Sequence, residues 1–329
     1  MLENGACRLR PNVRQILREL DRRGVLLSIA SANDEDLALT QLRKKRIDRL
    51  FLHPQICWGN KVSSIERIAR MLNLSLNSVA FIDDEPYELE QVHHLLPGVR
   101  VYHARDYGAL LRRHEFNPPF LTKESCRRRR MVIQGERRVS EQAKLTKSHR
   151  DFLMSCRTRM TVRRARKSDL PRILELMERT HQLNATGILY SPEEIRSFLD
   201  HPDFRIYVAE LRDRFVDYGR IGVALCRCQP GRWEILSFLL SCRVLTRGIG
   251  HSFLSWLQCE SHRNGALVLE CHYKKQERNH RMYLLYRLSG FESEEGETPG
   301  SFIFRKRISR PFNVPEWLTL VEEDRNPKP

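Results

Sequence analysis

Side chains able to carry out acyl chemistry gather in the stretch LLSCRVLTRGIG. This stretch places Cys242 before Arg243, Arg247, Gly248 and Gly250. Glycines that open a helix let backbone N–H groups approach a phosphate, and the helix terminus adds partial positive charge. Nearby cations and a helix N-terminus also stabilise a thiolate, so Cys242 is a candidate nucleophile. The alternative interpretation is a small, buried cysteine at the end of a strand.

A second polar stretch, THQLNATG at 180–187, lies between a predicted helix and a predicted strand. His181 is a candidate general base, and Gln182 and Asn184 are candidates to bind a hydroxyl or carbonyl group of a substrate. The alternative is a cluster that caps the end of the helix.

The first half of the chain carries paired carboxylates, Asp83 and Asp84, in the stretch FIDDEP. Such a pair is typical of Mg²⁺ ligands, because Mg²⁺ prefers hard oxygen atoms. An isolated aspartate pair is also common at helix caps. Ser31, Asp83 and Asp84 all fall at the carboxyl ends of predicted strands, where open α/β sheets place their sites.

The elements that must position these first-half residues alternate along 1–114. Amphipathic helices and short apolar strands predict a parallel sheet covered on both faces. Helices are predicted at 11–24, 34–45, 61–73 and 86–96, and strands at 25–31, 78–84 and 99–103.

The rest of the chain divides into a linker, a second domain and a tail. Residues 115–158 are polar and predict a helical linker, 159–308 form a second α/β domain, and 309–329 are predicted to be a peripheral tail. In the second domain, strands are predicted at 160–165, 204–211, 219–228, 233–244 and 266–273, and helices at 168–183, 247–265 and 279–292.

The composition of the chain limits the classes of partner that it is expected to bind. The formal net charge of +16 favours an anionic partner such as a phosphorylated metabolite or an acidic protein. Nucleic acid is disfavoured, because no stacking aromatics are interleaved with the arginines. Nine scattered cysteines, no secretory signal and no apolar run of about 20 residues predict a cytoplasmic protein that does not enter a membrane.

The second domain resembles N-acetyltransferase-like (GNAT-like) domains. The resemblance rests on RGIG at 247–250 and on Asn279 followed by YRLSGF at 286–291. It implies a mixed α/β fold in which Gly248 and Gly250 bind the pyrophosphate of an acyl-CoA. Leu245 stands where that loop usually begins with Gln or Arg.

The first domain resembles haloacid-dehalogenase-like (HAD-like) phosphotransferases. The resemblance implies a Rossmann-like parallel sheet, phosphate contacts from Ser31, Asn33 and Lys61, and Mg²⁺ bound by Asp83 and Asp84. The family's first strand and its DxD nucleophile motif are absent. We expect either that the given start lies roughly 20–25 residues downstream of the true one, or that neighbouring parallel strands keep unpaired edges.

Both halves together, with HPQICWGNK, FIDDEPYE, THQLNATG and LLSCRVLTRGIG, resemble the FkbH-like glyceryl transfer family. The resemblance implies an enzyme that takes a glyceryl unit from 1,3-bisphosphoglycerate, removes phosphate and loads the acyl group on the phosphopantetheine of an acyl carrier protein for polyketide biosynthesis. Cys242 would hold the acyl group and His181 would transfer protons. The expected substrate-binding residues are Ser31, Asn33, Lys61, Gln182, Asn184, Arg243, Arg247, Gly248, Gly250, Arg278 and Asn279.

Two alternatives remain open. One is an acetyl-CoA-dependent N-acetyltransferase with a degenerate HAD-like domain. The other is a non-catalytic scaffold that binds a carrier protein.

Overall fold

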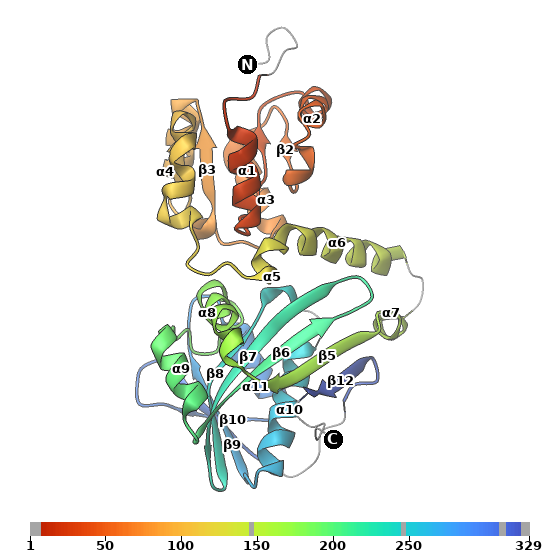
Figure 1. Ribbon diagram of the computed structural model, residues 1–329, viewed down its shortest axis with the longest axis vertical. Coiled ribbons are helices and arrows are strands. Elements are labelled where there is room, and N and C mark those ends of the chain that lie inside the picture. The colour runs from red at the N-terminus through yellow and green to blue at the C-terminus, as the bar shows by residue number, and fades with distance from the viewer. Residues whose placement is uncertain (1–7, 145–147, 245–247, 309–313, 324–329) are drawn as a thin grey trace. The chain divides into compact units, whose positions relative to one another are not determined.

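The computed structural model describes residues 8–144, 148–244, 248–308 and 314–323 (Figure 1). The chain divides into two compact units, Met1–Ile133 and Gln134–Pro329. The division falls within α6 (Arg128–Lys144), inside the segment predicted to be a helical linker. Each unit is therefore described by itself.

Unit 1 alternates helices and strands as its sequence predicts. In chain order, its elements are α1 (Val13–Arg22), β1 (Ala30–Ser31), α2 (Glu35–Lys44), β2 (Gln55–Ile56), α3 (Lys61–Met71), β3 (Ala80–Asp83), α4 (Pro86–Leu95), β4 (Arg100–His103) and α5 (Lys123–Cys126), with 3-10 turns at Asp48–Leu50, Leu76–Ser78, Ala104–Arg112 and His114–Phe116.

The strands of unit 1 form two separate parallel pairs, β1 with β2 and β3 with β4. Both pairs share the same two apolar cores. Ala30 of β1 and Phe81 of β3 belong to one core, and Leu27 and Ile82 belong to the other. In the described residues, β1 and β3 are thus each paired along one edge only.

The apolar stretch 25–31 is less regular than its composition predicts. It is half-exposed throughout, its ladder covers only Ala30–Ser31, and an isolated bridge joins Leu27 to Phe51. A strand that pairs on one side buries less backbone and less side-chain surface than a central strand does. The predicted fully buried strand is therefore wrong in extent, although its position is right.

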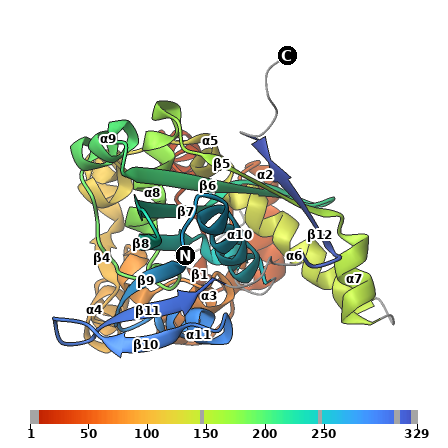
Figure 2. The same cartoon turned by 90° about the horizontal axis from the view of Figure 1, so that it is seen from below.

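Unit 2 contains an eight-stranded mixed sheet in the order β10-β11-β9-β8-β7-β6-β5-β12, which can be followed in Figure 2. Its strands are β5 (Thr158–Arg164), β6 (Phe204–Arg212), β7 (Asp217–Gln229), β8 (Arg232–Leu240), β9 (Val268–Lys274), β10 (Glu292–Glu295), β11 (Ser301–Arg307) and β12 (Leu318–Glu322). Neighbours are antiparallel except at β8–β9 and β12–β5. The predicted mixed α/β domain is confirmed.

Helices and 3-10 turns complete unit 2: α7 (His149–Ser155), η5 (Lys167–Asp169), α8 (Leu170–Arg179), α9 (Pro192–Asp200), η6 (Cys242–Val244), α10 (Ile249–Arg263) and α11 (His280–Leu288). Helix α10 packs closely on the sheet because it buries an aromatic face. The ring of Trp256 meets Tyr207 of β6 at 5.1 Å, and that of Phe253 meets Phe238 of β8 at 5.4 Å.

The C-terminal segment is not peripheral, contrary to the sequence prediction. Leu318–Glu322 forms β12, which pairs in parallel with β5 over five residue pairs. The segment also contacts α10, since the ring of Trp317 lies 3.5 Å from the position a Cβ atom would take on Gly248. Composition alone misjudged this segment because its pairing partner lies more than 150 residues earlier in the chain.

None of the described helices is both long and apolar enough to cross a membrane. None of the eight described cysteines forms a disulfide bond.

Candidate functional site

The N-terminus of α10 has the geometry of an anion-binding site. Its N-cap is Gly248, with φ 66°, which has no side chain to cap the helix. The left-handed conformation suits glycine because it has no Cβ. Backbone N–H groups in the first turn of an uncapped helix lack intrahelical acceptors, and the helix dipole adds partial positive charge there. A phosphate or carboxylate therefore fits this end of α10.

Gly250 allows α10 to pack closely against β8 and α11. A Cβ atom at this position would lie 2.8 Å from Leu240 of β8 and 3.3 Å from Leu285 of α11. Only glycine lets the first turn of α10 sit this close to the end of β8. The glycine pair of the sequence motif thus has two physical roles, a positive φ at Gly248 and close approach at Gly250.

Cys242 lies in η6, directly after β8, and is exposed. The alternative of a buried strand-end cysteine is therefore wrong. Two arginines were expected to stabilise its thiolate. Arg247 lies outside the described residues, and so does the side chain of Arg243. Leu245, the departure from the GNAT-like pattern, is also outside the described residues.

The parallel strands β8 and β9 pair only as far as Ile235 and Cys271. Beyond that point, residues 183–185 lie along β8. The Ala185 N–H donates to Phe238 O at 3.0 Å, and the Leu240 N–H donates to Leu183 O at 2.8 Å. The Lys274 N–H in turn donates to Ala185 O at 3.0 Å. The polar stretch predicted near the site thus bridges the separated ends of the two strands.

Asn279 holds this bridge together. Its side-chain N–H group donates to Asn184 O at 3.0 Å and to Lys274 O at 2.9 Å. Its side-chain oxygen accepts from Tyr273 Oη at 3.0 Å and from the Gln276 N–H at 2.9 Å. The residue is fully buried. These contacts make Asn279 a positioning residue for the 183–186 segment.

The structure separates the roles proposed for the 180–187 stretch. His181 is exposed and Gln182 is half-buried, so both side chains are open to a ligand. Asn184 is buried, and its side-chain oxygen accepts from the Gly187 N–H at 2.9 Å. Asn184 therefore closes its own turn, whereas the alternative interpretation expected the cluster to cap the end of the helix. Arg278, also expected to bind substrate, is exposed next to Asn279.

Sequence reasoning missed a polar cluster beside the first turn of α10. His251 Nδ1 lies 3.0 Å from Ser289 Oγ, and Lys306 Nζ donates to Ser289 O at 2.7 Å. Burial, and then the charge of Lys306, lowers the pKa of His251. Burial also lowers the pKa of Lys306. The histidine directly follows RGIG, but its partners lie 38 and 55 residues away, so no local pattern reveals the cluster.

In unit 1, two predicted residues meet at the carboxyl end of β3. Lys61 Nζ donates to Asp83 Oδ2 at 2.7 Å, and Asp83 Oδ1 accepts from the Glu85 N–H at 3.0 Å. Both charged side chains are largely buried, and Lys61 Nζ also lies 3.7 Å from Glu88 Oε1. The ammonium group of Lys61 is therefore already paired with two carboxylates of unit 1.

The other predicted site residues of unit 1 are exposed or half-buried. Asp84 is 74% exposed and lies 4.0 Å from Arg10. Ser31 and Asn33 are half-buried at the end of β1, where Asn33 Oδ1 accepts from the Asp34 N–H at 2.8 Å.

The predicted magnesium site is not assembled in the described part of the chain. No three His, Cys, Asp or Glu side chains gather there as metal ligands. Both oxygens of Asp83 accept hydrogen bonds, and Asp84 points to solvent. The residues present therefore do not fit a Mg²⁺ ion, and we assign no step to one.

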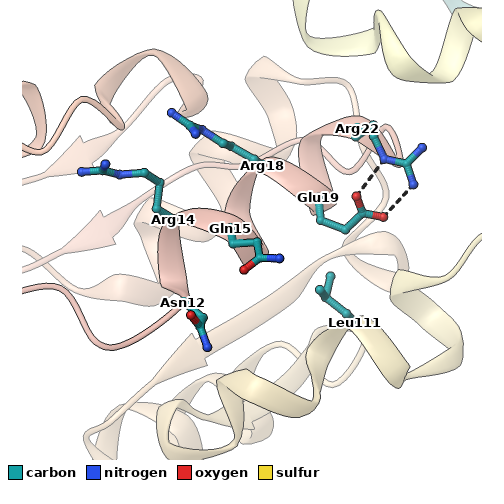
Figure 3. Close-up of a pocket in the computed structure, with 7 residues that line it drawn as sticks. All are labelled: Asn12, Arg14, Gln15, Arg18, Glu19, Arg22 and Leu111. Carbon is teal, nitrogen blue, oxygen red and sulfur yellow. Dashed lines mark hydrogen bonds and ion pairs between the residues drawn. The ribbon is translucent and has the colours of Figure 1, made fainter.

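A surface hollow in unit 1 lies along α1, and no predicted site residue lines it (Figure 3). Glu19 accepts from Arg22 at 2.7 and 2.8 Å, and this contact, together with Arg23, lowers the pKa of Glu19 to about 2. The residues that line the hollow are Asn12, Arg14, Gln15, Arg18, Glu19, Arg22 and Leu111.

Comparison with solved structures finds similarity to acetyltransferases over just under half of this chain. The ribosomal-protein-S18-alanine N-acetyltransferase of Escherichia coli is 16% identical, with a TM-score of 0.37, over 46% of this chain and 95% of that one. The PaiA N-acetyltransferase of Thermoplasma acidophilum, in complex with coenzyme A, is 20% identical, with a TM-score of 0.33, over 45% and 98%.

The putative acetyltransferase YncA of Salmonella typhimurium, solved with acetyl-CoA, is 17% identical, with a TM-score of 0.35, over 48% of this chain and 98% of that one. At these TM-scores the likeness carries no argument about function. No protein-family model matches the sequence, and no curated protein matches it.

Proposed function

We propose that unit 2 is an acyltransferase that binds a phosphate-bearing thioester at the N-terminus of α10. The observation that carries this proposal is the uncapped first turn at Gly248, directly after a strand end that exposes Cys242. Free backbone N–H groups bind the phosphate, and the end of β8 leads from this anchor toward the 183–186 segment. The proposed phosphate anchor and the 183–186 segment thus both lie near the same end of β8.

The donor we propose first is an acyl-CoA, with acetyl-CoA as the simplest case. The backbone N–H groups of Gly248, Ile249 and Gly250 are those that would hold its pyrophosphate. Coenzyme A, when bound, supplies the activated thioester. His181, exposed on the 180–187 stretch, is the proposed base that takes a proton from an attacking amine.

The experiment is an acetyl-CoA turnover screen against a panel of amines, read as release of free thiol. Gly248→Val should lower turnover at least tenfold, because valine is strained at φ 66° and adds bulk at the phosphate anchor. Gly231→Val is the matched control. Gly231 has φ 73°, nothing lies within 4 Å of its Cβ position, and it belongs to the β7–β8 turn. An equal loss of turnover in both variants would mean that backbone strain alone lowers the activity. That result would overturn the assignment of the phosphate anchor.

The exposure of Cys242 favours a second candidate, glyceryl loading of an acyl carrier protein. The Cys242 thiolate would attack the acyl carbon of 1,3-bisphosphoglycerate, the bond to the acyl phosphate oxygen would break, and inorganic phosphate would leave. The thiolate of the carrier's phosphopantetheine would then take the 3-phosphoglyceryl group and return the thiolate of Cys242. Removal of the 3-phosphate would be a separate hydrolysis, in which water cleaves the phosphate ester and inorganic phosphate leaves. Lys61 and Ser31 are the residues of unit 1 proposed to bind a phosphate for that separate step.

Intact mass spectrometry tests this second candidate. Incubation with 1,3-bisphosphoglycerate should add about 168 Da, the mass of a 3-phosphoglyceryl group that replaces hydrogen, or about 88 Da once water has hydrolysed the 3-phosphate. Cys242→Ala should abolish both the adduct and carrier loading. Cys126→Ala is the control, because Cys126 is also exposed but lies in unit 1. Undiminished loading by Cys242→Ala would remove the cysteine from the mechanism.

A further inference from the structure

Helix α11 exposes leucines on the face turned away from its core. Leu284 is 43% exposed and Leu288 is 82% exposed. They lie four residues apart and therefore side by side on one face. Arg281 and Arg287 are exposed on the same side of the helix, three residues from Leu284 in either direction. The two leucines thus form a small apolar strip with a guanidinium group on each flank.

The opposite face of α11 is firmly packed. Met282 and Tyr286 are fully buried, and the ring of Tyr286 meets that of Phe304 of β11 at 5.1 Å. The exposure of Leu284 and Leu288 is therefore a property of a well-anchored helix. Leucines on such a face remain solvated unless another surface covers them.

The C-terminal end of α11, which carries Leu288, lies near the candidate acyl-transfer site. Leu285 lies 3.3 Å from the Cβ position of Gly250, and Ser289 Oγ lies 3.0 Å from His251 Nδ1. Both contacts join the second half of α11 to the first turn of α10. A molecule that covers Leu288 consequently lies beside the phosphate anchor.

The charges define the partner. Among the described residues, neither Arg281 nor Arg287 forms an ion pair, whereas Arg305 and Arg263 of the same unit are both paired with glutamates. The whole chain carries a formal net charge of +16. Unpaired cations around an apolar strip complement a surface of carboxylates around an apolar side chain, and such complementarity steers association.

We propose that Arg281, Leu284, Arg287 and Leu288 of α11 form the docking face for an acidic carrier protein that delivers a phosphopantetheine arm to the N-terminus of α10. The inference rests on the proposed function, since it assigns the acyl-transfer site a protein-borne thiol. Leu288 supplies the apolar contact, and the two arginines bind carboxylates of the carrier.

The test measures binding of a purified acyl carrier protein that bears its phosphopantetheine, by surface plasmon resonance with the full chain. The double variant Arg287→Glu/Leu288→Asp should bind at least tenfold more weakly, because it reverses one charge and removes the apolar contact. Raising the salt concentration should weaken carrier binding by the unaltered protein more than carrier binding by the variant. A thermal unfolding profile like that of the unaltered protein shows that the variant is folded.

The matched control is Arg212→Glu/Leu267→Asp, which alters an exposed arginine and a leucine that is 67% exposed elsewhere in unit 2. The docking face would be overturned by any of three results. The α11 variant could bind the carrier as tightly as the unaltered protein, the control variant could lose as much affinity as the α11 variant, or the unaltered protein could fail to bind the carrier. Carrier binding without acyl transfer from any thioester or acyl phosphate would instead overturn the proposed function and leave the docking face standing.

Discussion

Glu322, in the last strand of the sheet, accepts a hydrogen bond from Trp256 Nε1 in α10 at 2.8 Å. The same oxygen accepts from Arg263, the last residue of α10, at 2.9 Å. With Trp317 against Gly248, the C-terminal segment contacts α10 at its first turn, its middle and its last turn. The segment therefore fixes the position of the helix that carries the candidate site.

Replacement of Glu322 by Ala should destabilise unit 2 by about 2 kcal/mol, because it removes an acceptor shared by a buried indole and a guanidinium group. Urea unfolding followed by tryptophan fluorescence measures the change. Glu316→Ala is the control, since its ion pair with Arg150 is exposed and should contribute about 0–1 kcal/mol. Equal effects in the two variants would contradict the anchoring role.

Asn279→Ala should cost about 3 kcal/mol or more, because it leaves several buried backbone carbonyl and N–H groups without partners. It should also release residues 183–186 from β9, seen as faster hydrogen exchange at Ala185 and Lys274. Asn264→Ala, at the exposed end of α10, serves for comparison. Unchanged exchange at Ala185 would show that the bridge holds without the amide.

Lys61→Met tests the charged pair of unit 1. It leaves Asp83 largely buried with one hydrogen bond, so unit 1 should lose about 1–3 kcal/mol. Lys167→Met breaks a highly exposed pair with Asp200 and should cost less than about 1 kcal/mol. Chemical denaturation with a probe in each unit separates the two effects, and a smaller loss for Lys61 than for Lys167 would refute the burial argument.

The pH dependence of unit 2 should depend partly on His251. Its pKa is lower in the folded protein than the ordinary value near 6.5, so the unfolded chain binds the proton more readily. The stability contribution is therefore fully present above about pH 6.5 and is lost as the pH falls below that value. The melting temperature should drop more between pH 7.5 and 5.5 in the unaltered protein than in His251→Gln. His262→Gln, on the same helix, should keep the full drop.

The local patterns of this sequence predicted the order of helices and strands in unit 1, the mixed α/β character of unit 2, and the helix that begins after RGIG. Those predictions depend on periodicity and on glycine conformation, which act within a few residues. The same patterns placed Ser31, Asp83 and Asp84 at the carboxyl ends of predicted strands, which in a parallel sheet lie on the same side. Lys61 was expected near them only from the resemblance to HAD-like proteins.

Tertiary structure decided what local patterns leave open. Whether Cys242 is exposed, whether Asn279 meets substrate or backbone, and whether residues 318–322 form a strand all depend on partners far away in the sequence. The separation of β1 from β3 is of the same kind, because strand pairing is a contact between segments and not a property of either one. Side-chain chemistry could be read from single residues, but burial and hydrogen-bond partners exist only once the chain has brought distant segments together.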